Sequence, residues 1–224
     1  GMGDTLLCNG LIRHFAEKYD IVYIFAKLNY IKNVLYMYRD NPKIKIIQMD
    51  DNQVKSFMTI NPNNNYLILG HTNDYMSKID SKVWTFEEGF YKIAEVPFEY
   101  KWSKFFFQRD LEKEKEAFKK IGLAEGEKYI FIHDDPKRGR IFKKQYLNSS
   151  IKSIHPVNYQ DIGLFDFLYT IENAYEVHVH NSSFANLIDT LELKIDRLFY
   201  HKYARQEVGL DQTFSKNLNW IFLN

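Results

Sequence analysis

The sequence predicts an α/β protein built from two Rossmann-like halves whose parallel sheets face a cleft. Short runs that are apolar throughout alternate with amphipathic stretches along the whole chain, and no solenoid-period repeat interrupts them. Strands that are apolar on both faces are typical of parallel sheets covered on both sides by helices. The character of the sequence changes near residues 100–110. We therefore predict an N-terminal half at residues 1–108 and a C-terminal half at residues 109–224.

In the N-terminal half, the first predicted helix covers residues 5–19, where Leu7, Leu11 and Phe15 recur every four residues. Asp4 stands at the expected N-cap. No strand precedes this helix, although a Rossmann-like half should open with one. Two explanations stay open: the encoded protein starts late, or the first strand of this sheet is missing from this chain. The other predicted elements are strands at 21–26, 44–49 and 66–70 and helices at 30–39 and 86–94.

In the C-terminal half, residues 110–121 form a predicted helix with Leu111, Ala117 and Phe118 facing inward and Gly122 closing it. Its charged residues form a solvated face rather than a binding tail. Further strands are predicted at 129–133, 151–155, 176–180, 197–200 and 219–223, with helices at 164–174 and 183–191.

The composition excludes several classes of partner. The 224 residues include 30 Lys and Arg against 29 Asp and Glu, for a formal charge of +1. Electrostatic binding of nucleic acid or of an anionic membrane requires a clear basic excess. The apolar runs have strand length, no signal peptide is recognisable, and the single Cys8 excludes an internal disulfide. Gly1-Met2 reads as a cloning scar before an initiator Met, and we expect a cytoplasmic protein.

The strongest candidate site lies where the strand at 176–180 meets the following helix. Ligands of open parallel sheets bind beyond the carboxyl ends of the strands. A helix N-terminus offers free N–H groups and about half a positive charge, which suits phosphate. Asn181, Ser182 and Ser183 could add side-chain donors, with Phe184 opening the helix, and His180 could bond a ligand from the strand end. The alternative is that one serine merely caps the helix.

A second candidate site follows the strand at 129–133. His133 ends that strand, and Lys137, Arg138 and Arg140 come soon after it, where a diphosphate would need positive charge. The alternative is a solvated Pro-Gly turn. Asp134-Asp135 would suit Mg²⁺ by residue type, but adjacent side chains on a turn point apart.

Other motifs give weaker indications. Gly3-Asp4 forms a short turn into a helix, and Asp4 reads as an N-cap or as a base. His178 and His180 share one strand face, but a third and fourth zinc ligand of matching spacing are lacking. The chain has no serine nucleophile elbow, P-loop or complete dinucleotide fingerprint, which argues against an oxidoreductase.

With these sites in view, the chain resembles glycosyltransferases of the GT-B type. The segment from Gly3 to Arg13 is similar to the start of the lipopolysaccharide heptosyltransferases. In that family the aspartate of this motif is thought to act as general base toward the acceptor hydroxyl. The resemblance therefore implies that Asp4 is the catalytic base.

The C-terminal half resembles the fucosyltransferase-related branch. There, a strand ending in a His- and Arg-bearing loop and a later Ser-Ser-Phe contact the nucleotide diphosphate; here these positions are His133, Arg138 and Ser182-Ser183-Phe184. Fucosyltransferases carry a tighter His-x-Arg-Arg pattern, whereas this loop reads His-Asp-Asp-Pro-Lys-Arg. The resemblance thus leaves the nucleotide base open.

Together these features lead us to expect a metal-independent glycosyltransferase that moves a sugar from a nucleotide sugar to a glycan or other hydroxyl acceptor. It would use no cofactor and no metal. A non-catalytic nucleotide- or sugar-binding module and a sugar-nucleotide epimerase remain as alternatives. A lost first strand would leave a sheet edge open to pairing with a second copy, as in a homodimer.

Overall fold

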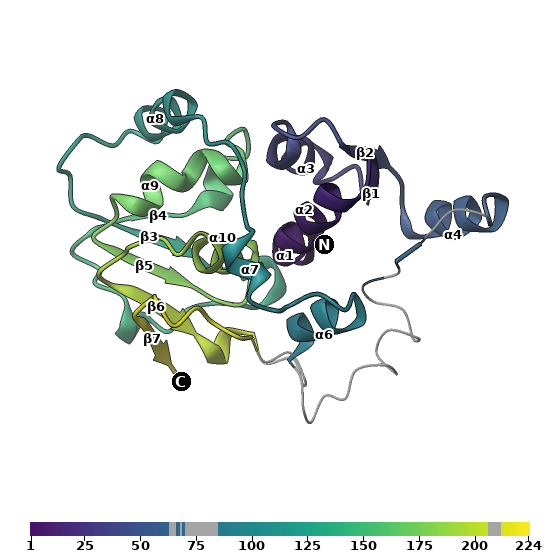
Figure 1. The fold of residues 1–224 in the computed structure, drawn as a ribbon. Coiled ribbons are helices and arrows are strands. Elements are labelled where there is room, and N and C mark those ends of the chain that lie inside the picture. Colours follow the sequence, from purple (N-terminus) through teal and green to yellow (C-terminus); the bar gives the residue numbers. More distant parts are fainter. Residues whose placement is uncertain (63–65, 68, 70–84, 206–211) are drawn as a thin grey trace. The chain divides into compact units, whose positions relative to one another are not determined.

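The computed structural model describes residues 1–62, 66–67, 69, 85–205 and 212–224. Within these residues the chain is an α/β protein with one two-stranded and one five-stranded sheet, both parallel (Figure 1). It divides into two compact units. Unit 1 comprises Gly1–Gln108 with Gly209–Thr213, and unit 2 comprises Arg109–Val208 with Phe214–Asn224.

Unit 1 contains a short sheet of β1 (Val22–Ala26) and β2 (Ile44–Gln48), paired in parallel with Val22 opposite Ile44. Both strands confirm the predictions at 21–26 and 44–49. Of the strand predicted at 66–70, residues 68 and 70 lie outside the described residues, and residues 66, 67 and 69 belong to no strand. The helices are α1 (Met2–Leu7), α2 (Asn9–Lys18), α3 (Ile31–Tyr38), α4 (Asp51–Ile60), α6 (Phe86–Ile93) and α7 (Tyr100–Ser103).

The start of the chain differs from the prediction. The helix begins at Met2, so Asp4 lies inside its first turn and is not the N-cap. The Asp4 carboxylate accepts a hydrogen bond of 2.6 Å from the ammonium of Gly1. The predicted single helix is also divided, because Cys8 ends α1 and caps α2. The hydrophobic period of four continues across this break, so the pattern gave no sign of it.

A close approach between two helices fixes the core of unit 1. Leu7, Leu11 and Tyr91 are buried in one hydrophobic cluster. On α2, Gly10 packs directly on the backbone of α7, because a Cβ at this position would lie 1.8 Å from the carbonyl oxygen of Tyr100. Glycine is required there by space, not by backbone conformation.

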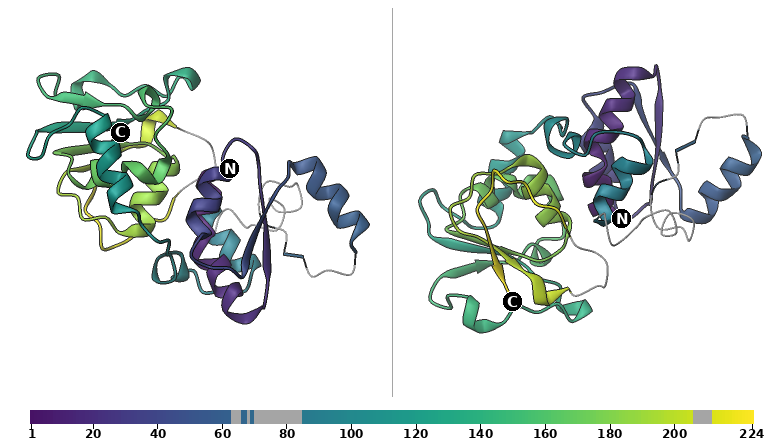
Figure 2. Two further views of the ribbon diagram at one scale, coloured as in Figure 1. Left: turned by 90° about the horizontal axis from the view of Figure 1, so that it is seen from above. Right: turned by 60° about the horizontal axis from the view of Figure 1, so that its bottom comes forward.

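Unit 2 contains β3 (Tyr129–His133), β4 (Lys152–Ile154), β5 (Glu176–Val179), β6 (Leu198–His201) and β7 (Trp220–Leu223). All neighbours pair in parallel, in the order β4-β3-β5-β6-β7, with β7 at one edge (Figure 1, Figure 2). Counted within the unit, this order is 2-1-3-4-5. The chain leaves β3 first toward one edge and later returns to its other side, so the topological switch point lies between β3 and β5.

The two faces of this sheet are covered differently. On one face Phe131 packs against Phe167 and Phe184, and the Tyr129 hydroxyl donates to the carbonyl of Thr170. The helices on unit 2 are α8 (Leu111–Lys120), α9 (Leu168–Glu172) and α10 (Ser183–Leu191), and α8 lies beside α9 (Figure 1). On the other face Ile130 and Ile132 pack against Phe142, from the irregular segment that follows β3. None of the helices in the described parts of the chain is long and apolar enough to cross a bilayer.

Replacing Gly10 by alanine should destabilise unit 1. The added methyl group would overlap the Tyr100 carbonyl, and such overpacking against backbone should lower the free energy of unfolding by about 3 kcal/mol or more. Urea unfolding measures this loss.

The matched control is Gly126→Ala. Its new methyl group meets no heavy atom within 4 Å, but the backbone φ is +76°. The expected loss is therefore only the left-handed strain of about 1 kcal/mol. Equal losses in the two variants would contradict the close approach.

Candidate functional site

Two of the three predicted sites come together in unit 2. His133 at the end of β3 lies opposite Val179 at the end of β5 in the parallel register. The residues that follow both strands therefore share one carboxyl edge, at the topological switch point, where ligands of such sheets bind. Asp4 lies in unit 1.

The N-terminus of α10 is capped by Ser182. Its backbone is extended, and its hydroxyl accepts from the backbone N–H of Ala185 at 3.4 Å. The same hydroxyl lies 3.1 Å from Nδ1 of His133. The Ser182 side chain thus both caps α10 and contacts His133 at the end of β3. The serine is a cap, as the simpler interpretation expected, and it also belongs to the polar cluster.

His180 is the unusual member of this cluster. Its side chain is 1% exposed, and neither ring nitrogen meets a hydrogen-bond partner among the described residues. The ring stacks on His133, with centroids 5.4 Å apart and planes 11° from parallel. A buried polar group needs a partner, so the part of the chain that the structure describes leaves both ring nitrogens available to one.

His133 and His180 are uncharged at neutral pH. Burial, with the positive charges of Arg140 and Arg205, lowers the pKa of His180 to about 4, although the Asn181 backbone partly opposes this shift. Burial, followed by the neighbouring His180, likewise lowers the pKa of His133 to about 4. The influence of both arginines on His180 indicates that their positive charges lie close to this edge.

The cationic loop after β3 is a closed hairpin. Asp135 and Arg140 exchange two backbone hydrogen bonds of 2.9 Å, and Gly139 adopts a φ of +71° at the tip. Lys137 and Arg138 lie on the exposed tip, where Arg138 is 3.4 Å from Asp135. The predicted Pro-Gly turn is therefore present.

Two further arginines belong to this edge. The Arg140 side chain is only 16% exposed. Arg205, which follows β6, donates to the carbonyl oxygen of Asn181 at 3.1 Å. Arg140 was visible in the sequence as part of the cationic loop. The sequence around Arg205 did not indicate that it belongs to this site, because only the strand order places the end of β6 next to the end of β5.

The remaining predicted ligand contacts differ in exposure. Asn181 and Ser183 are half-buried and flank the cap. The Phe184 ring is 6% exposed and lies between Phe131, Phe167 and His133 in the core. Phe184 can reach a ligand only through its backbone N–H.

A separate series of hydrogen bonds lies on the sheet face that Phe142 covers. Lys143 N–H donates to the Tyr203 hydroxyl, which leaves that hydroxyl to donate to Nδ1 of His201 at 2.8 Å. His201 and His178 share a hydrogen bond of 2.9 Å, and His178 reaches the Glu176 carboxylate at 3.3 Å.

Both ring nitrogens of His178 are thus occupied by hydrogen bonds. In the part of the chain that the structure describes, no three His, Cys, Asp or Glu side chains gather closely enough to hold a metal ion.

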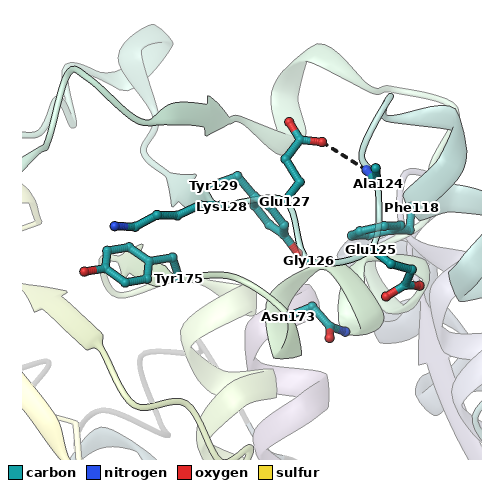
Figure 3. Close-up of a pocket in the computed structure, with 9 residues that line it drawn as sticks. All are labelled: Phe118, Ala124, Glu125, Gly126, Glu127, Lys128, Tyr129, Asn173 and Tyr175. Atoms are coloured by element: carbon teal, nitrogen blue, oxygen red, sulfur yellow. Dashed lines mark hydrogen bonds between the residues drawn. The ribbon is translucent and has the colours of Figure 1, made fainter.

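The opposite, amino-terminal edge of the sheet carries a pocket of about 250 Å³ (Figure 3). Its polar groups are already engaged. The Glu127 carboxylate accepts from the Ala124 N–H at 3.0 Å, and the Lys128 ammonium lies 3.6 Å from the centre of the Tyr175 ring. With carboxylates at its rim and no helix N-terminus, this pocket is poorly suited to phosphate.

Comparison with protein-family models, with curated proteins and with solved structures finds no significant match to this chain. The candidate site is therefore defined by its own geometry: a capped helix N-terminus, a buried histidine without a partner among the described residues, and two arginines at the switch point of a parallel sheet.

The buried histidines should make folding sensitive to acid. The unfolded chain protonates His180 near pH 6.5, but the folded chain only near pH 4. Since the unfolded state binds more protons in this window, the free energy of unfolding falls as the pH drops. His180 alone should account for about 2 kcal/mol between pH 7 and pH 5.

Urea unfolding at the two pH values measures this dependence. In His180→Asn the difference between pH 7 and pH 5 should shrink, because that variant lacks the titrating ring. A free energy of unfolding that is equal at both values in the parent chain would contradict the assignment of buried neutral histidines.

Proposed function

We propose that unit 2 binds the diphosphate of a nucleotide sugar at the N-terminus of α10, and that the chain is a metal-independent glycosyltransferase of the GT-B type. The observation that carries this proposal is the buried His180 ring, which has no partner among the described residues and lies on His133, itself 3.1 Å from the α10 cap. A phosphate oxygen at this point could accept from His180, from the Ser182 hydroxyl and from free N–H groups of the helix.

The charges around this point match the chemistry of a departing diphosphate. In sugar transfer, negative charge develops on the leaving group as its bond to the sugar breaks. Arg140, Arg205 and the partial positive charge of the α10 N-terminus would stabilise that charge. Since such groups supply what Mg²⁺ provides in other folds, we expect the reaction to need no metal. Lys137 and Arg138, on the exposed tip, should contribute less because water screens their charges.

The fold of unit 2 supports the proposal more strongly than that of unit 1. The 2-1-3-4-5 order of unit 2 is that of an open doubly wound sheet, which fits the donor-binding half of a GT-B enzyme. Unit 1 would supply the acceptor side, and the resemblance assigns Asp4 as its base. In the structure that carboxylate bonds the ammonium of Gly1.

A non-catalytic nucleotide- or sugar-binding module is the second candidate. It is favoured by the small sheet of unit 1, which has two strands within the described residues. Binding of nucleotide sugars with no release of nucleoside diphosphate would identify such a module. Turnover would identify the transferase.

The proposal predicts that UDP, GDP or ADP raises the melting temperature of the chain. A thermal-shift titration should show saturable stabilisation by at least one of the three. Arg205→Ala and Arg140→Ala should each weaken the binding of that nucleotide by at least about 10-fold, because each removes a charge-assisted contact to phosphate.

Arg197→Ala is the matched control. Arg197 precedes β6 at the opposite edge of the same sheet and binds Glu176 at 3.1 Å. Its loss should leave the nucleotide-induced shift unchanged. The proposal is wrong if none of the three nucleotides shifts the melting temperature, or if all three arginine variants behave alike.

A further inference from the structure

A histidine–aspartate pair lies at the same carboxyl edge of the sheet. Asp134 directly follows β3, and His155 directly follows β4. These strands are parallel neighbours, with Phe131 opposite Ile154, so the residues that follow them lie at the same carboxyl edge of the sheet. Nδ1 of His155 lies 3.4 Å from Oδ1 of Asp134. The side chain of Asp134 is 11% exposed and that of His155 is 31% exposed, so the histidine ring is the more accessible of the two.

This geometry fixes the proton on the histidine. A carboxylate can only accept, so in the neutral ring of His155 Nδ1 carries the hydrogen and Nε2 has the lone pair. Among the described residues, none bonds Nε2. A carboxylate that orients an imidazole in this way prepares its other nitrogen to take a proton and stabilises the resulting positive charge.

The pair borders the proposed phosphate site. Asp134 is the next residue after His133, whose ring meets the Ser182 cap. The negative charge of Asp134 raises the pKa of His133 against the effect of burial, which indicates that the two side chains are close. In the strand order, β4 lies next to β3 on the side away from β5. The pair thus flanks the site where the diphosphate would leave.

We propose that His155 is the general base of the reaction and that Asp134 is its positioning residue. The inference rests on the proposed function, and it gives His155 the role that the resemblance assigns to Asp4. The acceptor hydroxyl oxygen forms a bond to the anomeric carbon while Nε2 of His155 takes the hydroxyl proton. The bond from that carbon to the phosphate oxygen breaks, and the nucleoside diphosphate leaves with the electron pair.

The test uses the full chain with UDP-glucose, GDP-mannose and ADP-glucose, in water and with glycerol as an added acceptor. Release of nucleoside diphosphate is measured beside the melting shift caused by the free nucleotide. His155→Ala should keep the melting shift and lower the release rate by about 10²–10⁴-fold. Added imidazole should restore part of the lost rate, because it replaces the missing base.

Two further variants make the test specific. Asp134→Asn can present an N–H to Nδ1 and so favours the wrong tautomer; it should lower kcat with little change in KM. His14→Ala is the matched control, because His14 also lies beside a carboxylate, 3.9 Å from Glu17, but in unit 1. Its release rate should equal that of the parent chain.

The outcomes separate the inference from the proposed function. Full release by His155→Ala, or absence of imidazole rescue, would overturn the inference and leave the proposed function in place. Nucleotide binding without release by the parent chain would identify the non-catalytic module and would overturn both the transferase and the inference. Failure of every nucleotide to shift the melting temperature would overturn the proposed function, and the inference with it.

Discussion

The parallel pairing of β3 with β5 is the constraint on which the candidate site depends. It places His133 opposite Val179, and so brings two loops that are about 45 residues apart in the sequence to one edge. The pairing is held by side chains such as Ile130, Phe131 and Val177, which are fully buried. Because the chain passes to β4 before it returns to β5, no strand separates the two loops. A different strand order would separate His133 from the α10 cap.

The electrostatics of this edge follow from that packing. His180 is kept uncharged by burial and by two arginines, and its ring nitrogens are left without partners among the described residues. Burying ring nitrogens without partners is costly, and an anion at this point would provide an acceptor and offset the arginine charges. His178, one pleat away on the same strand face, shows the contrast. Both of its ring nitrogens form hydrogen bonds, to Glu176 and His201, so its hydrogen-bonding groups are satisfied within the protein.

Much of this arrangement could be predicted from the sequence. The apolar runs identified the strands of unit 2, and the polar residues before Phe184 identified the start of α10, because both signals are local. The division of the first helix at Cys8 could not be seen, since its hydrophobic spacing continues across the break. Asp4 looked like an N-cap because acidic residues favour both the cap and the first turn, and only the structure places it in the turn.

The parts of the site that depend on strand order could not be predicted. Arg205 and His155 lie far from His133 in the sequence, and only the order β4-β3-β5-β6 brings the ends of their strands to the same edge. Local patterns report which strands exist, but the neighbours of each strand are decided by how the whole sheet packs. For the same reason Lys137 and Arg138 ranked highly in the sequence, although the hairpin between Asp135 and Arg140 leaves them on its exposed tip.

The central claim is that an anion binds between the buried histidine and the cap of α10. The most direct measurement is a nuclear magnetic resonance titration of the ¹⁵N-labelled chain with UDP, GDP and ADP. Binding at this edge predicts large shifts of the His180 ring nitrogens and of the backbone amides of Ser183 and Phe184. Shifts confined to the pocket of Glu125, Glu127 and Tyr175 at the opposite edge, or no shifts at all, would contradict the account.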